Sequence, residues 1–211
     1  MKRVLVFCAH SDDQVFGPGG YTTKLAKEGS KIHTIICSYG EMSHPHLKEQ
    51  EVQQIRVKEA EKADKMLGGS GVMFLGLKEG SFEHECKPIY HDVIKTIKKL
   101  KPDMILTHSS DDPHPDHRAV HRMFLKLYDD AGLQCSVYTF DVWNLFNLGK
   151  RKNPKLVVDV TKTFKKKIDA LQAFKSQRMA LVVLLWSVYT KAVIWGFRRG
   201  CRYAEVFYKI R

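Results

Sequence analysis

Short apolar runs alternate with longer amphipathic stretches along most of this chain. The runs are almost wholly apolar, which is typical of strands buried on both faces of a parallel sheet. The alternation predicts an α/β fold: a doubly wound, mostly parallel sheet with helices on both faces, as in Rossmann-like proteins. The expected strands lie at about 3–9, 31–38, 72–75, 103–108, 136–142, 155–160 and 204–210. The first expected helix ends near Glu28, three more cover about 48–67, 87–100 and 115–130, and a further helix begins at about Thr161.

Nothing in the sequence resembles a linker between two folded units. A chain of 211 residues is long enough for one well-buried α/β domain and short for two. We therefore expect residues 1–211 to form a single domain.

The apolar stretch from Met179 to Phe197 requires a separate interpretation. Lys191 interrupts it, so it falls short of the roughly 20 apolar residues that a membrane span needs. We expect a buried helix here or a contact with a second copy of the chain in a homo-oligomer. The alternative is a helix that lies on a membrane surface, flanked by Arg198, Arg199 and Arg202.

The net charge of +12 is concentrated in the last third of the chain. Residues 143–211 hold 16 Lys and Arg against 3 Asp and Glu. A solvated basic face is the simplest interpretation, and a surface for an anionic partner is the alternative. No nucleic-acid-binding motif is present, so we expect no nucleic-acid partner.

The five cysteines are scattered, without a Cys-x-x-Cys pair. This pattern predicts a reducing compartment rather than a disulfide framework. Lys2 and Arg3 precede only a short apolar run, which does not match a signal peptide. We therefore expect a cytoplasmic protein.

Two polar clusters follow predicted strands: His10-Ser11-Asp12-Asp13-Gln14 and His114-Pro115-Asp116-His117. In an open α/β sheet, ligands bind at the carboxyl ends of the strands, so neighbouring parallel strands would bring both clusters to one crevice. Two His with one Asp form a typical catalytic zinc shell, with one position left for water. Taken singly, each residue has a simpler interpretation, because an Asp pair after a strand is often a helix N-cap.

Two further features of these clusters bear on the reaction. Asp12 lies beside a candidate ligand and could take a proton from an attacking water, while His114 could stabilise an oxyanion or protonate a leaving amine. Asp116 could orient an imidazole through its second nitrogen. The glycine-rich turn at 17–20 lacks the Gly-x-Gly-x-x-Gly pattern and follows two carboxylates, which disfavours a dinucleotide site.

The two clusters resemble the motifs of the PIG-L/LmbE family of zinc-dependent N-deacetylases. That family's Ala-His-Pro-Asp-Asp-Glu stands here as 9–14, and its His-Pro-Asp-His is intact at 114–117. Looser matches extend the resemblance over nearly the whole chain. They are Tyr39-Gly40-Glu41, Arg56 with Glu59, Leu77 to Gly80, Val158 to Val160, Lys167 to Leu171, Ser176-Gln177 and Tyr203 to Phe207.

The resemblance implies a role for eight residues of this chain. It implies a single LmbE-like deacetylase domain that acts on a small-molecule N-acetylglucosamine conjugate. The basic last third of the chain favours a conjugate that carries negative charge. The implied roles are zinc ligands His10, Asp13 and His117, general base Asp12, oxyanion donor or acid His114, orienting partner Asp116, and weaker candidates for substrate binding Arg56 and Glu79.

The chain departs from the family motif at two positions. Ser11 replaces Pro and removes no ligand, whereas Gln14 replaces Glu and removes a charge close to the expected metal. The sequence leaves two alternatives to the sugar deacetylase. One is an amidase of the same mechanism on a non-sugar N-acyl substrate, and the other is an impaired or non-catalytic protein that binds anionic glycans or lipids.

Overall fold

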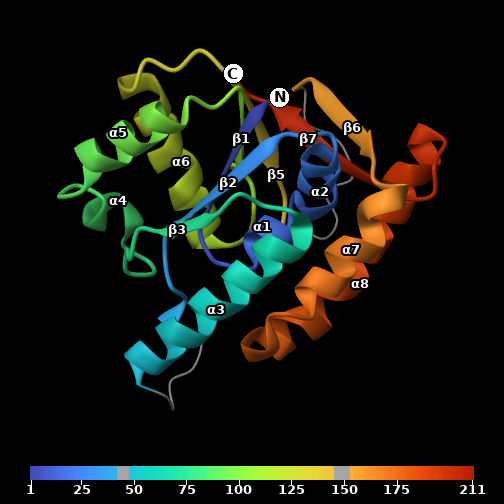
Figure 1. Ribbon diagram of the computed structural model, residues 1–211, viewed down its shortest axis with the longest axis horizontal. Helices are drawn as coiled ribbons and strands as arrows, with labels where there is room; N and C mark the ends of the chain where they lie inside the picture. The colour runs from blue at the N-terminus through green and yellow to red at the C-terminus, as the bar shows by residue number, and fades with distance from the viewer. Residues whose placement is uncertain (42–47, 145–152) are drawn as a thin grey trace.

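A computed structural model of the chain describes residues 1–41, 48–144 and 153–211. It contains one seven-stranded sheet with helices on both sides (Figure 1). The first five strands in sheet order are parallel, and β7 runs antiparallel to its neighbours β5 and β6. The sheet order is β3 (Val72–Phe74), β2 (Lys31–Ile36), β1 (Arg3–Cys8), β4 (Met104–His108), β5 (Ser136–Phe140), β7 (Ala204–Lys209) and β6 (Lys155–Asp159).

The predicted doubly wound, mostly parallel α/β fold is confirmed. Alternate residues of β1 enter two separate cores: Val4 and Val6 belong to one, Leu5 and Phe7 to the other. The first core is covered by α1 (Asp13–Phe16), α2 (Gly19–Lys27), α3 (Glu49–Leu67), α7 (Thr161–Leu171) and α8 (Arg178–Arg199), and the second by α4 (Phe82–Glu85), α5 (Tyr90–Leu100) and α6 (Pro115–Asp130). Both faces of β1 are therefore buried from Val4 to Cys8, which explains why these residues are all apolar.

The helix expected after the first strand is divided into α1 and α2. Pro18 separates them, because a proline has no N–H to donate and disfavours helical backbone at the residue before it. Gly17 fits at this break because a Cβ there would overlap the ring of Phe140. The short helix α4 was not predicted, and the helix expected at 87–100 begins at Tyr90.

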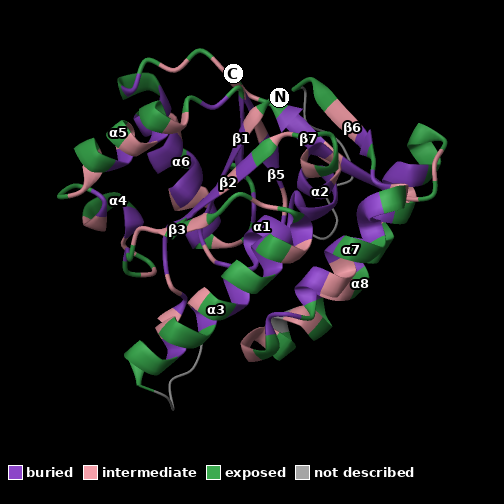
Figure 2. Cartoon of the chain, in the orientation of Figure 1, coloured by how far each residue is buried: buried purple, intermediate pink, exposed green. Residues whose placement is uncertain are grey.

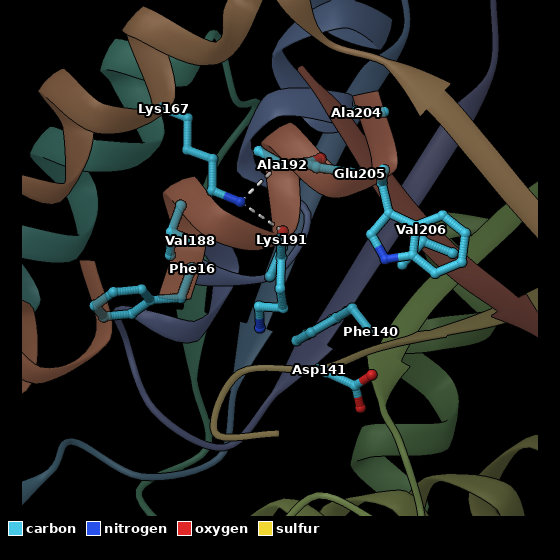
Figure 3. Close-up of a pocket in the computed structure, with 12 residues that line it drawn as sticks. Phe16, Phe140, Asp141, Lys167, Val188, Lys191, Ala192, Ala204, Glu205 and Val206 are labelled. Carbon is cyan, nitrogen blue, oxygen red and sulfur yellow. Dashed lines mark hydrogen bonds and ion pairs between the residues drawn. The ribbon is translucent and has the colours of Figure 1, made fainter. Parts of the chain in front are cut away.

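The N-terminus of α2 is occupied by a carboxylate of the chain itself. Glu205 on β7 accepts hydrogen bonds from the backbone N–H of Gly20 at 2.9 Å and of Tyr21 at 2.8 Å. Nζ of Lys167 lies 2.7 Å from Glu205 Oε1 and 2.9 Å from the carbonyl oxygen of Gly17 (Figure 3). The glycine-rich turn is thus a packing junction between α2, α7 and β7.

Helix α8 is buried on one face only, which corrects the expectation of a buried helix. Leu184, Val188 and Trp195 pack into the core, whereas the opposite face is exposed (Figure 2). By length and composition, Leu181–Arg199 is apolar enough to cross a membrane, with a third of that window buried inside the protein.

Candidate functional site

The two polar clusters meet at the carboxyl edge of the sheet. Strands β1 and β4 are adjacent and parallel, with Phe7 in register with Thr107, so both strands end at the same level. The ring centroids of His10 and His117 lie 5.6 Å apart. The two clusters, which are far apart in the sequence, therefore lie side by side in the fold, as expected.

Asp13 lies between the two imidazoles. Its Oδ1 is 3.3 Å from Nε2 of His117, and its Oδ2 is 3.5 Å from Nδ1 of His10. His10, Asp13 and His117 offer ligand atoms that all lie within 4.8 Å of one another. A second such group consists of His10, His114 and Asp116.

The second group is less suited to a metal because one polar atom of His114 and one of Asp116 already bind the backbone. Nδ1 of His114 accepts the backbone N–H of Asp116 at 3.2 Å, as the N-cap of α6. Oδ1 of Asp116 accepts the backbone N–H of Gly80 at 2.9 Å. The other oxygen of Asp116 lies 3.4 Å from Nε2 of His10, so this carboxylate can orient an imidazole.

Glu79 lies closer to the centre of the site than a substrate-binding residue would need to. Its Oε1 is 3.3 Å from Nε2 of His10, the same nitrogen that faces Asp116. Two carboxylates therefore approach Nε2 of this imidazole, and its Nδ1 faces Asp13.

Asp112 was not predicted, although it is fully buried in the site. Its Oδ1 lies 3.0 Å from Nδ1 of His117 and accepts the backbone N–H of His114. Its Oδ2 accepts the N–H groups of Val142 and Trp143, just after β5. The only sequence signal was its position two residues before the His-Pro-Asp-His motif.

His108, the last residue of β4, was also missed. It is buried, its ring stacks on that of His117 at 3.9 Å, and its Nε2 lies 3.2 Å from Asp13 Oδ2. The same Nε2 accepts the backbone N–H of Ala9, so this nitrogen carries no proton. Burial and the neighbouring His117 lower the pKa of His108 to about 4, which keeps the ring neutral.

The carboxylates hold positive charge on the two candidate ligand imidazoles. Burial alone lowers the pKa of His117, but Asp13 and Asp112 outweigh it and raise that pKa to about 9. Burial is likewise outweighed at His10, whose pKa is raised by Asp116, Asp13 and Glu79. Burial would raise the pKa of Asp13, yet the surrounding histidines lower it well below its usual value. The site therefore favours a cation.

Arg56 and Asp12 lie next to each other in the site. Nη2 of Arg56 is 3.5 Å from Asp12 Oδ1, and its Nε donates to the backbone carbonyl of Tyr39 at 3.4 Å. Its buried Nη1 has no hydrogen-bond partner among the described residues. Glu59 was paired with Arg56 in the looser family match. Its carboxylate accepts hydrogen bonds from the backbone N–H and the hydroxyl of Ser176.

Gln14 is used in packing rather than in the site. Its amide donates to the carbonyl of Ser11 at 3.2 Å and accepts from the hydroxyl of Thr34 at 3.1 Å. An ionised Glu could not make the first of these bonds. The departure from the family motif at this position thus comes with a local hydrogen-bond pattern of its own.

A cavity of about 230 Å³ opens over these groups. Trp143, Gln177 and Leu184 contribute to its wall from outside both motifs. Of these, Gln177 belongs to the looser family match Ser176-Gln177, whereas Trp143 and Leu184 were not predicted as site residues. The full lining is His10, Asp12, Asp13, Phe16, Gly40, Arg56, Glu79, His114, Val142, Trp143, Gln177 and Leu184.

The residues at the centre fit a divalent metal ion. Nε2 of His117 is buried, points at Asp13 and makes no hydrogen bond within the described chain. Two imidazoles with one carboxylate are ligands that zinc prefers. The second nitrogens of both imidazoles face carboxylates, as is usual for metal-bound histidines.

Comparison with known proteins defines the family. Residues 5–128, more than half of the chain, match the family described as PIG-L: GlcNAc-PI de-N-acetylase, so the chain belongs to the PIG-L family. This family membership confirms the resemblance drawn from the two motifs.

Two relatives of this chain carry different activities in their names. The chain is 26% identical over 192 residues to the probable N-acetyl-alpha-D-glucosaminyl L-malate deacetylase 2 of Bacillus cereus, covering 86% of each. It is 24% identical over 215 residues to the 4-oxalmesaconate hydratase of Pseudomonas putida, covering 92% of this chain and 79% of the hydratase.

A solved structure confirms the fold. The N,N'-diacetylchitobiose deacetylase of Pyrococcus horikoshii superimposes with a TM-score of 0.83 at 24% identity, covering 99% of this chain and 84% of the deacetylase. At this identity the likeness supports the shared fold.

Proposed function

We propose that this chain is a zinc-dependent hydrolase that removes the acetyl group from an N-acetylglucosamine-type sugar conjugate, with water as the nucleophile. The observation that carries the proposal is the convergence of His10, Asp13 and His117, with His10, Asp13 and the neighbouring Asp12 also lining the cavity. The B. cereus and P. horikoshii proteins, both named as deacetylases of acetylated amino-sugar compounds, support the substrate class.

His10, Asp13 and His117 would hold the zinc ion in this proposal. A bound zinc supplies Lewis-acid polarisation of the amide carbonyl and lowers the pKa of water. Asp112 and Asp116 fix the two imidazoles through their second nitrogens and increase their basicity.

Asp12 is the proposed general base. It lines the cavity one residue from Asp13, so its carboxylate can accept the proton that water releases as it attacks the amide carbon. Nη2 of Arg56 lies 3.5 Å from Asp12 Oδ1 and can help to orient this carboxylate. The remaining donors of Arg56 suit the polar groups of a sugar conjugate.

His114 is better suited to stabilising the oxyanion than to protonating the amine. Because its Nδ1 accepts a backbone N–H, the neutral ring carries its proton on Nε2, which can donate to a developing negative oxygen. Burial, His117 and His10 lower the pKa of His114, which disfavours the imidazolium that a general acid would need. The proton taken by Asp12 can instead pass to the leaving nitrogen.

Product analysis on the full chain tests this proposal. The chain is incubated with zinc and a panel of N-acetylglucosamine conjugates, including N,N'-diacetylchitobiose and an N-acetylglucosaminyl malate, with an N-acetyl amino acid as the non-sugar amide. We expect about one zinc per chain and equal amounts of acetate and free amine from at least one sugar conjugate. Turnover of the N-acetyl amino acid alone would contradict the proposed sugar substrate. A chain that binds no metal and turns over no substrate would contradict the proposed hydrolase activity.

Hydration of a carbon–carbon double bond is the second candidate, favoured by the long match to the P. putida hydratase. In that reaction Asp12 would take a proton from the same activated water, and the water would add to an alkene instead of an amide. Incubation with 4-oxalmesaconate distinguishes the two, because hydration removes a conjugated double bond and releases neither acetate nor amine. Loss of the substrate absorbance without acetate from any conjugate would favour the hydratase.

A further inference from the structure

Helix α8 presents a continuous apolar face to solvent. Its exposed large apolar side chains recur at helical spacing and span an arc of about 120° at 3.6 residues per turn. Among the described positions between Met179 and Phe197, Thr190 is the only exposed residue outside this set. The apolar face of α8 consists of Met179, Val182, Val183, Trp186, Tyr189, Val193 and Phe197, which are 40% to 87% exposed.

The helix is fixed by its opposite face, so this surface is a permanent feature of the fold. Val188 and Ala192 face the Lys167–Glu205 ion pair (Figure 3). Gly196 packs so closely on the backbone of 201–202 that a Cβ there would clash. Soluble monomers rarely expose a contiguous apolar patch of this extent, so the face calls for a partner.

The charges around this face identify the chemistry of the partner. Between Asp169 and Glu205 the sequence contains six basic residues and no acidic one. Arg178 and Arg199 stand at the two ends of α8, both exposed. A second copy packed on the same face about a two-fold axis would bring like charges together. A surface that is apolar beneath and anionic above complements both features.

We propose that the apolar face of α8 docks in the plane of a lipid bilayer that carries anionic headgroups. Trp186 and Tyr189 belong to the residue types that favour the membrane interface, and the terminal arginines would meet lipid phosphates. The helix lies flat and does not span, because its other face forms part of the protein core.

Docking would place the cavity next to the bilayer. Gln177 and Leu184 line the cavity. Both lie at the N-terminal end of α8, close in sequence to Met179 and Val182 of the apolar face. The inference rests on the surface of α8 alone and is independent of the reaction proposed above.

Sedimentation of the full chain with vesicles tests the docking. We expect binding to equimolar phosphatidylglycerol and phosphatidylcholine, and much weaker binding to phosphatidylcholine alone. Val182→Glu/Phe197→Glu should weaken binding at least about tenfold, because each carboxylate would be driven into the interface. Met73→Glu, which adds a carboxylate at an exposed apolar position of β3, is the matched control and should bind like the wild type.

Two further measurements separate docking from other causes. Arg178→Gln/Arg199→Gln should weaken binding about fivefold per arginine. Trp186 fluorescence should shift to the blue on anionic vesicles, and Trp186→Phe should abolish the shift while leaving binding intact. Vesicle binding that survives Val182→Glu/Phe197→Glu would reveal adsorption by charge only and overturn the proposal. So would a failure to bind together with a dimer that the same double variant dissociates in analytical ultracentrifugation.

Discussion

Oδ1 of Asp112 lies 3.0 Å from Nδ1 of His117, and both side chains are completely buried. The same carboxylate accepts backbone N–H groups from His114, Val142 and Trp143. One residue therefore fixes the orientation of a proposed zinc ligand, the start of α6 and the segment that follows β5.

Replacing this carboxylate should weaken zinc binding. In Asp112→Asn the remaining oxygen can stay with the N–H groups of Val142 and Trp143, so the new amide N–H₂ would face Nδ1 of His117 and the N–H of His114 would lose its acceptor. The proton of the imidazole would then move to Nε2, the nitrogen that points at Asp13. We expect zinc affinity to fall about 10- to 100-fold in a competition titration with a chromophoric chelator.

The neighbouring Asp111 offers a matched control for this measurement. Asp111→Asn makes the same chemical change at an exposed position. It should leave zinc affinity within about twofold, which is the behaviour of ordinary surface substitutions. Equal losses in both variants would contradict the orienting role of Asp112.

Zinc should stabilise the folded chain through Asp13. A ligand at one hundred times its Kd adds about 2.7 kcal/mol, which corresponds to a rise in Tm of about 5–10 °C for a chain of this size. We expect this rise in the wild type, its reversal by a chelator, and its loss in Asp13→Asn. A wild-type Tm that does not respond to zinc would contradict the proposed ligand set.

The zinc effect should also depend on pH in a defined direction. The pKa of His117 is raised to about 9, so in the metal-free protein its protonated form adds stability that is full below about pH 6.5 and is lost as the pH rises through 9. Zinc must displace that proton. The gain in Tm on adding zinc should therefore increase between pH 6 and pH 8, as differential scanning calorimetry can measure.

Asp12 should be needed for turnover but not for metal binding. Asp12→Asn retains the shape of the side chain and removes its ability to accept a proton, so we expect kcat for acetate release to fall about 10²- to 10⁴-fold. Zinc affinity should stay within a few-fold of the wild type because Asp12 is outside the proposed ligand set. A variant that keeps its turnover would exclude Asp12 as the base.

The sequence revealed the parts of this protein that depend on local pattern. The strands β1 and β4 are largely apolar, and each of the two polar motifs follows one of them along the chain, so their convergence could be predicted. Asp112 and His108 act through contacts with His117 that only the folded chain creates. The antiparallel direction of β7 leaves no mark in periodicity, and the apolar residues of α8 look alike whether they face the core or solvent.

Asp64 should make the stability of the chain depend on pH away from the site. Burial raises its pKa to about 6, and the N–H of Gly71 only partly offsets this. The folded state therefore binds a proton that the unfolded state releases, and stability should fall as the pH rises from about 4 to about 6. Asp64→Asn should remove this loss, with a gain on the order of 1–2 kcal/mol at pH 7.5 and little change at pH 4. Urea unfolding at the two pH values measures it; equal effects at both would contradict the assignment.

Two lysines on α7 allow buried and exposed ion pairs to be compared at equal distance. Lys167 Nζ lies 2.7 Å from Glu205 in the core, and Lys165 Nζ lies 2.7 Å from Asp169 on the surface. Lys167→Met leaves the carboxylate of Glu205 buried with only the N–H groups at the start of α2, so we expect a loss of about 3–5 kcal/mol in urea unfolding. Lys165→Met should cost about 0–1 kcal/mol.

A double variant separates the ion pair from general packing. In Lys167→Met/Glu205→Gln no charge is left buried, and the amide oxygen can still accept one N–H at the start of α2. It should therefore recover part of the stability that Lys167→Met alone loses, since removing both charges is cheaper than stranding one. A double variant less stable than either single one would show that the methionine disrupts packing beside Gly17 and would refute the electrostatic account of this junction.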